Sequence, residues 1–378
     1  MFFTTKIPQI STKPLFRTLK TRLSAPLCSA APMTKRSKGK QPKPSGSTRP
    51  SKGSLVDIAA STLEKITRGS YDINGHTYNA KLAIDDMNKR TAFYSADSNL
   101  AEWRSERQAH SEPEGAEADG ASAKEGTVKI AVSECSMLAG ARELSELVAL
   151  EAEKEKDVEK RVGVLNFASA KNPGGGFLKG ASAQEESIAR SSTLYPSLLT
   201  PQAQQFYHSH RKDPKEGYYS HAMIYSPHVL LIRTDSGDWH SPVPVEMATS
   251  CAVNAGVVRR YLRQRQREGD ESELDEAMKE RMARVLYLFE RHGVRNLVLG
   301  SFGTGVFRNR VELVAETWRE LLVGEEARFG RSFDRVVFAI LGRETFGTFQ
   351  RIFSELEDAT GAGGVRGGKE SQEVGTKL

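Results

Sequence analysis

Three consecutive glycines, followed after seven residues by a glutamine and two glutamates, are the residues of this chain whose types and spacing suggest chemistry. Residues 174–176 have no side chains, so the main chain there can approach a ligand closely, at a cost in backbone entropy. Gln184, Glu185 and Glu186 begin a stretch whose apolar residues, as far as Leu199, recur at helical spacing. The apolar segment before the glycines predicts a buried strand. A strand, a glycine loop and a helix start in this order direct backbone N–H groups and a positive helix end toward an anion.

The two glutamates are neighbours in sequence, so on a helix their side chains point in directions about 100° apart. They therefore cannot face each other across one bond, as the carboxyl pair of typical glycosidases does. If both serve one substrate, one must hold hydroxyl groups while the other donates a proton. A helix N-terminus lowers the pKa of a carboxyl group, and we expect the bound anion and desolvation to raise it again.

A second glycine-rich segment, residues 300–307, follows an apolar run and precedes a helical pattern, so its N–H groups could also hold phosphate. Neither glycine segment fits a generic nucleotide motif. Ala181 and Ser182 stand where a P-loop requires lysine followed by serine or threonine, and the second segment lacks the third glycine of a dinucleotide fingerprint. Phe307 is expected either to press on the bound ligand or to pack in the core.

The spacing of the three glycines and the Gln-Glu-Glu triplet resembles the catalytic signature of poly(ADP-ribose) glycohydrolases, which have a macrodomain-type fold. Residues 166–168 and 191–198 resemble the microbial-type branch of that family. Residues 300–307 are similar to the family's diphosphate-binding loop, with Thr304 where cysteine is common. The resemblance covers about residues 57–355, and the segment 169–173 is one residue longer than in the animal enzymes.

The resemblance implies hydrolysis of ribose–ribose O-glycosidic bonds in poly(ADP-ribose), with release of ADP-ribose and a role in the DNA damage response. Glu186 would be the general acid, with Glu185 as its catalytic neighbour; Glu185 and Gln184 would fix the ribose. No cofactor and no metal would be needed. The implied substrate-binding residues are Gly174, Gly175, Gly176, Gln184, Gly303, Thr304, Gly305, Val306 and Phe307, with Asn172 as a candidate for the adenosine ribose. The alternatives are a non-catalytic ADP-ribose-binding macrodomain and a hydrolase of another ADP-ribosyl adduct.

The charge of the chain is divided between a basic N-terminus and an acidic body. Residues 1–56 carry twelve Lys and Arg and no acid, which leaves 42 basic and 48 acidic residues beyond them. A body of net charge −6 is a poor candidate for nonspecific DNA binding. The expected partners are poly(ADP-ribose) or ADP-ribosylated proteins as substrate, with no DNA, no membrane and a monomeric body.

The N-terminal segment divides at Met33. Residues 1–32 are rich in Ser and Thr, basic and free of acids, as in a mitochondrial transit peptide, although a disordered basic tail is the alternative. Translation from Met33 would omit this part and predicts a nuclear or cytoplasmic protein. We expect a disordered tail over 1–54, a catalytic domain over 55–356 with a disordered insert at 105–126, and a flexible tail over 357–378.

Alternating helical and strand patterns predict an α/β fold, a macrodomain-type three-layer sandwich with a mixed, largely parallel sheet and an N-terminal helical extension. Three scattered cysteines and a lone close histidine pair, His208 and His210, match no metal motif. Helices are expected at 55–68, 138–159, 247–263, 274–292, 311–322 and 346–356, strands at 127–135, 162–168, near 223, at 229–232, 294–299 and 335–341, and a turn at 233–239.

Overall fold

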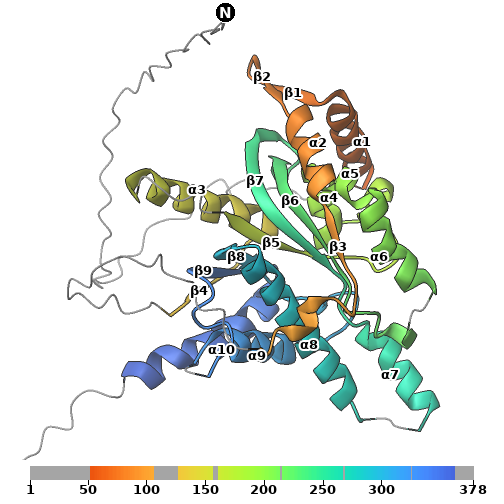
Figure 1. The fold of residues 1–378 in the computed structure, drawn as a ribbon, viewed down its shortest axis with the longest axis vertical. Coiled ribbons are helices and arrows are strands. Elements are labelled where there is room, and N and C mark those ends of the chain that lie inside the picture. The colour runs from red at the N-terminus through yellow and green to blue at the C-terminus, as the bar shows by residue number, and fades with distance from the viewer. Residues whose placement is uncertain are drawn as a thin grey trace, which may run out of the picture. The chain divides into compact units, whose positions relative to one another are not determined.

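A seven-stranded sheet with helices on both faces forms the body of the protein (Figure 1). The computed structural model describes residues 52–105, 127–155, 161–212, 215–266, 269–324 and 326–361. The sheet order is β3 (Ala92–Tyr94), β6 (Met223–Arg233), β7 (Trp239–Ser250), β5 (Val162–Phe167), β8 (Asn296–Leu299), β9 (Arg335–Ala339) and β4 (Lys129–Ser133). The helices are α1 (Lys52–Arg68), α2 (Lys81–Arg90), α3 (Met137–Glu155), α4 (Gln184–Ser191), α5 (Leu194–Leu198), α6 (Pro201–Lys212), α7 (Ala255–Gln264), α8 (Ser272–Arg291), α9 (Val311–Leu322) and α10 (Arg343–Gly361). A separate two-stranded sheet pairs β1 (Ser70–Ile73) with β2 (His76–Asn79).

The strand directions place five carboxyl ends at one edge of the sheet. Parallel pairing joins β7, β5, β8, β9 and β4. At the other side of the sheet, β6 pairs antiparallel with β7, and β3 pairs antiparallel with β6. The mixed, largely parallel sheet and the N-terminal helix α1 confirm the predicted fold class. In such sheets ligands bind beyond the carboxyl ends of the parallel strands, so the loops that follow β5 and β8 are in the expected place for a site.

Alternation along the central strands assigns each side chain to one of two cores. Leu165 of β5 and Leu297 and Leu299 of β8 lie in a core with α7 to α10, while Val164 and Val298 lie in a second core with α2 to α6. Both faces of these strands are therefore buried, which explains why their sequences read as continuous apolar runs.

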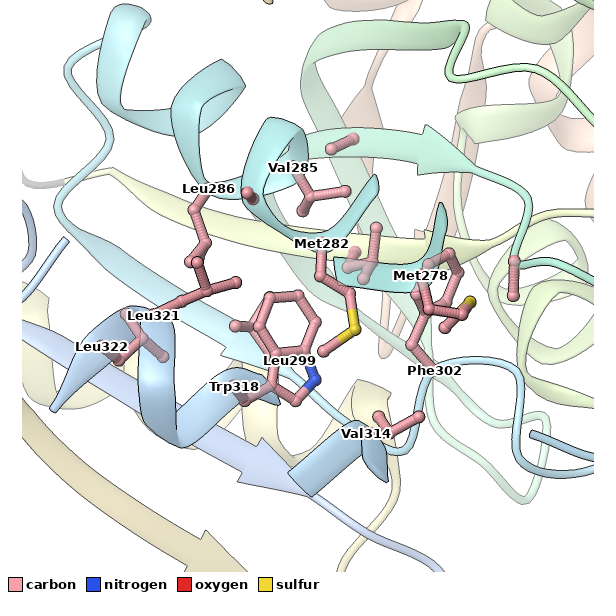
Figure 2. Close-up of a cluster of buried hydrophobic side chains, with 14 of the residues drawn as sticks. Met278, Met282, Val285, Leu286, Leu299, Phe302, Val314, Trp318, Leu321 and Leu322 are labelled. Carbon is pink, nitrogen blue, oxygen red and sulfur yellow. The ribbon is translucent and has the colours of Figure 1, made fainter. Parts of the chain in front are cut away.

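The first core also anchors the glycine loop that follows β8. Figure 2 shows Trp318 of α9 among Met282, Leu299 and neighbouring apolar side chains of α8 and α9, with Phe302 in the same cluster. Trp318 is buried, and its indole N–H donates to the carbonyl oxygen of Gly300 at 3.1 Å. The start of the loop is thereby fixed to the most tightly buried part of the molecule.

Two predicted helices differ from the structure. Met247 lies in β7, and helix α7 begins only at Ala255, so the helix expected over 247–263 is wrong in its first part. β7 is flanked by β6 and β5, and burial on both faces gives an apolar run that periodicity alone does not distinguish from a helix. The helix starting at Gln184 ends at Ser191, where the next residue is extended and bridges to Leu231.

The outer boundaries of the body were predicted more closely. α1 begins at Lys52, three residues before the expected start, and α10 continues to Gly361. The predicted targeting segment at 1–32, almost all of the predicted insert at 105–126 and the end of the predicted C-terminal tail lie outside the described residues. Within the residues that the structure does describe, no helix is long and apolar enough to cross a membrane.

Candidate active site

A cavity of about 930 Å³ lies at the edge of the sheet where the parallel strands end. Its walls come from the segments that follow β5, β7, β8, β9 and β4, together with the first turn of α4. Both glycine segments border this one cavity, although 124 residues of sequence lie between Gly176 and Ser301. Every candidate substrate-binding residue except Gly174 lines it: Asn172, Gly175, Gly176, Gln184, Gly303, Thr304, Gly305, Val306 and Phe307, along with Glu185 and Glu186.

Glu186 is held directly against the triple-glycine loop. The backbone N–H of Gly176 donates to Oε1 of Glu186 at 2.9 Å. Gly175 adopts φ +62°, and a Cβ there would overlap Oε1 of Glu186 and lie 2.9 Å from its Cδ. The position must therefore be glycine both for its left-handed backbone and for the close approach of the carboxyl group.

Glu185 is buried beside Glu186 in a different environment. Its Oε2 accepts the backbone N–H of Ser169 at 2.6 Å, whereas its Oε1 is buried and has no hydrogen-bond partner within the described part of the chain. Burial raises the pKa of Glu185 to about 8, and the charge of Glu186 adds to this rise. The hydrogen bond from the Ser169 backbone opposes it. Glu185 is therefore mainly protonated at neutral pH.

Gln184 fixes the start of α4 to the end of β5. Its amide Nε2 donates to the carbonyl oxygen of Leu165 at 2.7 Å, and its Oε1 accepts the N–H of Phe167 at 2.8 Å. From the other side, the hydroxyl of Thr62 in α1 donates to the carbonyl oxygen of Arg190 in α4 at 2.7 Å. These bonds explain how α4 is positioned; the predicted contact of Gln184 with a ribose stays a prediction.

The loop after β8 presents unpaired N–H groups to the same cavity. Asn309 holds it in shape, because its Nδ2 donates to the carbonyl oxygens of Val253 at 2.8 Å and Gly303 at 3.0 Å. Gly303 has φ +75°, and a Cβ there would lie 2.6 Å from Nδ2 of Asn309. Among the described residues, no acceptor is found for the N–H groups of the three consecutive residues 305–307. Such a row of donors suits an anion.

Phe307 packs against the core, as one of the two expectations had it, and its contact with a ribose or adenine stays a prediction. It is partly buried, packs against the first core and has its ring 6.1 Å from that of Tyr219, yet it also lines the cavity. Asn172 is exposed at the cavity wall, and its carbonyl oxygen accepts the N–H of Gly175 at 2.9 Å. Its assignment to an adenosine ribose stays a prediction.

Asp235 and Ser136 line the cavity, although sequence reasoning did not identify them as cavity residues. Asp235 lies in the turn between β6 and β7, as the predicted turn at 233–239 requires, and it also lines the cavity. Its Oδ2 accepts the hydroxyl of Ser136 at 2.6 Å. Ser136 follows β4, so the pair is far apart in sequence and only the folded chain brings it together.

Of the two histidines considered for metal binding, His210 makes its contacts within the fold. His210 is buried, and burial lowers its pKa to about 4. Its Nε2 lies 2.7 Å from the hydroxyl of Ser220. In the described ranges, no group of three or more His, Cys, Asp or Glu side chains is placed to hold a metal ion.

Comparison with known proteins identifies what this cavity resembles. Residues 59–234 match the family described as microbial-type PARG, catalytic domain, where PARG denotes poly(ADP-ribose) glycohydrolase. A solved poly(ADP-ribose) glycohydrolase from Thermomonospora curvata is 35% identical, with a TM-score of 0.65, over 80% of this chain and 100% of that one. The same protein bound to the inhibitor ADP-HPD is 34% identical, with a TM-score of 0.63, over 79% and 99%.

A glycohydrolase of the same type from Deinococcus radiodurans, solved in complex with ADP-ribose, is 32% identical, with a TM-score of 0.58. That match covers 76% of this chain and 100% of the other. No curated protein sequence matches the chain.

Proposed function

Because this chain belongs to the microbial-type poly(ADP-ribose) glycohydrolase family and is therefore a glycosidase, we propose that it cleaves ribose–ribose bonds of poly(ADP-ribose) with Glu186 as proton donor. The observation that carries the proposal is the placement of two unlike carboxyl groups in the cavity that also contains the N–H donors of residues 305–307. One end of the cavity can thus hold a diphosphate while the other reaches the adjoining ribose.

Glu186 has the contacts required of a group that acts on a bound sugar. Its Oε1 is fixed by the N–H of Gly176, and no residue of the described chain makes a hydrogen bond to its Oε2. The second oxygen can therefore meet a substrate oxygen at the cavity wall without first giving up an internal partner. A single anchored oxygen also restrains the carboxyl group, which is the condition for efficient proton transfer.

The proposed reaction conserves protons over one cycle. Protonated Glu186 donates its proton to the 2′-oxygen of the neighbouring unit, the bond from that oxygen to the anomeric carbon breaks, and an oxocarbenium-like ribose forms. A water molecule adds to the anomeric carbon and returns a proton to the Glu186 carboxylate. The products are free ADP-ribose and a chain shorter by one unit when the terminal unit is cleaved.

Glu185 supports this step without donating the transferred proton. Glu185 lines the cavity, and the raised pKa favours its protonated form at neutral pH. It also leaves one negative charge fewer beside the incoming diphosphate. The two adjacent carboxyl groups thus take different roles because their environments differ, as in the acid–base pairs of other enzymes.

Glu186→Gln tests the proposal, with Glu185→Gln as the matched variant one position away. Glutamine retains the acceptor for the Gly176 N–H but has no proton to transfer, so kcat on labelled poly(ADP-ribose) should fall about 10²–10⁴-fold. The affinity for ADP-ribose, measured by calorimetry, should stay within about threefold of the wild-type value. A change of about 1.4 kcal/mol would correspond to tenfold. Full turnover by Glu186→Gln would overturn the assignment, and absence of turnover in the wild-type chain would favour a protein that only binds ADP-ribose.

A further inference from the structure

A second cavity of about 430 Å³ adjoins the outer side of the loop that follows β8. It lies along the first turns of α7 and is lined by four arginines, Arg259, Arg260, Arg263 and Arg308. Val306, which is 82% exposed, lines both this groove and the main cavity. We call it the arginine groove.

The arginine groove concentrates positive charge on a body that is otherwise acidic. The chain from Asp57 onward has 42 basic and 48 acidic residues, yet the described lining of the groove includes no Asp or Glu. Glu271 pairs with Arg259, but the exposed Arg260 and Arg308 add positive charge to the same groove, and an anion placed there would reduce their mutual repulsion. The arrangement therefore indicates an anionic ligand.

The four arginines differ in the contacts that their side chains already make within the protein. Arg259 makes a two-pronged ion pair with Glu271 at 2.7 and 2.9 Å, and its Nη1 donates to the carbonyl oxygen of Arg308. Arg259 thus fixes the loop to α7. Arg260 and Arg308 are exposed, and neither side chain has an ion pair within the described residues. Their guanidinium groups remain available to a ligand.

The backbone holds Arg308 toward the groove. Arg308 has φ +60°, a left-handed conformation that arginine rarely adopts, and its Cδ lies 3.4 Å from where a Cβ of Gly256 would be. The N–H of Gly256 donates to the carbonyl oxygen of Phe307 at 3.1 Å, which joins α7 to the loop at this point. The absence of a side chain at position 256 lets Arg308 lie across the helix start.

We propose that the arginine groove binds the diphosphate of a second ADP-ribose unit, next to the unit held in the main cavity. The inference rests on the proposed function, because it takes poly(ADP-ribose) as the occupant of the main cavity. Each unit of that polymer carries a diphosphate, and only residues of the loop around Val306 separate the two cavities. A continuous polyanion that leaves the main cavity along this wall meets Arg260 and Arg308. The protein should therefore hold long chains more tightly than free ADP-ribose.

Nucleic acid is the other polyanion that the arginine groove could attract. The shared wall with the main cavity favours the polymer that the main cavity already takes, and the net charge of the body disfavours nonspecific nucleic-acid binding. The two occupants are separated by the binding measurements below.

The test combines Arg260→Gln with Arg308→Gln and uses Arg265→Gln as the matched control. Arg265 follows α7 and lies over the ring of Tyr261, outside the arginine groove. Fluorescence polarisation would measure affinity for labelled long poly(ADP-ribose), for ADP-ribose and for single-stranded DNA, in the Glu186→Gln background so that the polymer is not cleaved.

The double variant should lose about tenfold or more in affinity for long chains, because two charge-assisted contacts with phosphate are removed. Affinity for ADP-ribose should be unchanged, as should both affinities in the control. The dependence of log affinity on log salt should become shallower by about 1.4, as expected for two single-stranded phosphate contacts. With wild-type Glu186 restored, KM for long chains should rise while kcat stays the same.

Unchanged affinity for long chains would overturn the proposal, and so would an equal loss for ADP-ribose, because the arginines would then belong to the main cavity. A loss for DNA without a loss for poly(ADP-ribose) would overturn it in favour of nucleic acid. Failure of the wild-type chain to cleave poly(ADP-ribose) is a separate result that contradicts the proposed function, since the polarisation assay needs no turnover.

Discussion

Gly175→Ala is the substitution that most directly tests whether the triple-glycine loop positions the acid. The new Cβ would overlap Oε1 of Glu186 and lie 2.9 Å from its Cδ and 3.0 Å from Oε2 of Glu185. Carbon atoms in contact need about 3.5 Å or more, so the Glu186 carboxyl group must retreat by roughly 1 Å. The 2.9 Å hydrogen bond from Gly176 N–H to Oε1 does not survive such a shift.

The expected loss is in turnover, because a displacement of this size near the reacting atoms can cost about 100-fold. Gly175→Ala should lower kcat on poly(ADP-ribose) by about that factor or more. Its left-handed φ of +62° adds about 1–2 kcal/mol of backbone strain, so thermal unfolding should occur a few degrees lower.

Gly75→Ala is the matched control for the strain. Gly75 lies in the turn between β1 and β2 with φ +80°, and a Cβ there would meet nothing within 4 Å. This variant should show the stability loss without the loss of turnover. Wild-type kcat in Gly175→Ala would refute the reasoning that this glycine exists to seat the acid.

Three further outcomes are expected. Glu185→Gln should be stabilising at high pH. The folded pKa of Glu185, about 8, lies above its unfolded value of 4.5, so its contribution to stability is fully present below pH 4.5 and is lost as pH rises through 8. The stability of the variant relative to wild type, measured by thermal unfolding, should therefore grow from pH 5 to pH 8 by up to about 1.4 kcal/mol per pH unit, and a constant difference would contradict this. Gly305→Val should weaken ADP-ribose binding about tenfold in calorimetry, since a Cβ there meets no protein atom and any loss reports on the ligand's approach to the backbone. Fusions that start at Met1 and at Met33 should reach different compartments under the microscope, and a shared compartment would contradict the proposed targeting role of residues 1–32.

The parts of the site that could be predicted are those set by local sequence. The buried strand β5, the triple-glycine loop and the helix starting at Gln184 are consecutive, and the same order recurs in β8, the loop at 300–307 and α9. Apolar periodicity and glycine position define such units without knowledge of distant contacts. Their meeting in one cavity follows from the parallel pairing of β5 and β8, because parallel strands end at the same edge.

The features that could not be predicted depend on contacts across the fold. The helix expected at 247–263 is wrong in its first part, because Met247 lies in a strand that is buried. Asp235 belongs to a turn, as its composition indicated, but its presence at the cavity depends on the path of the β6–β7 hairpin. A helical spacing of about 100° separates Glu185 from Glu186 and does not say which of them faces the interior.

The burial of Glu185 is best explained by what it does for the ligand. A carboxyl group with one oxygen buried and unpartnered is unfavourable for folding. Kept protonated by its surroundings, Glu185 adds no charge beside Glu186. Its ionisation near pH 8 would then add a negative charge facing a diphosphate, so we expect ADP-ribose binding to weaken above about pH 8. The adjacent glutamates are thus suited to different tasks by depth of burial, which is a property of the fold and not of the motif.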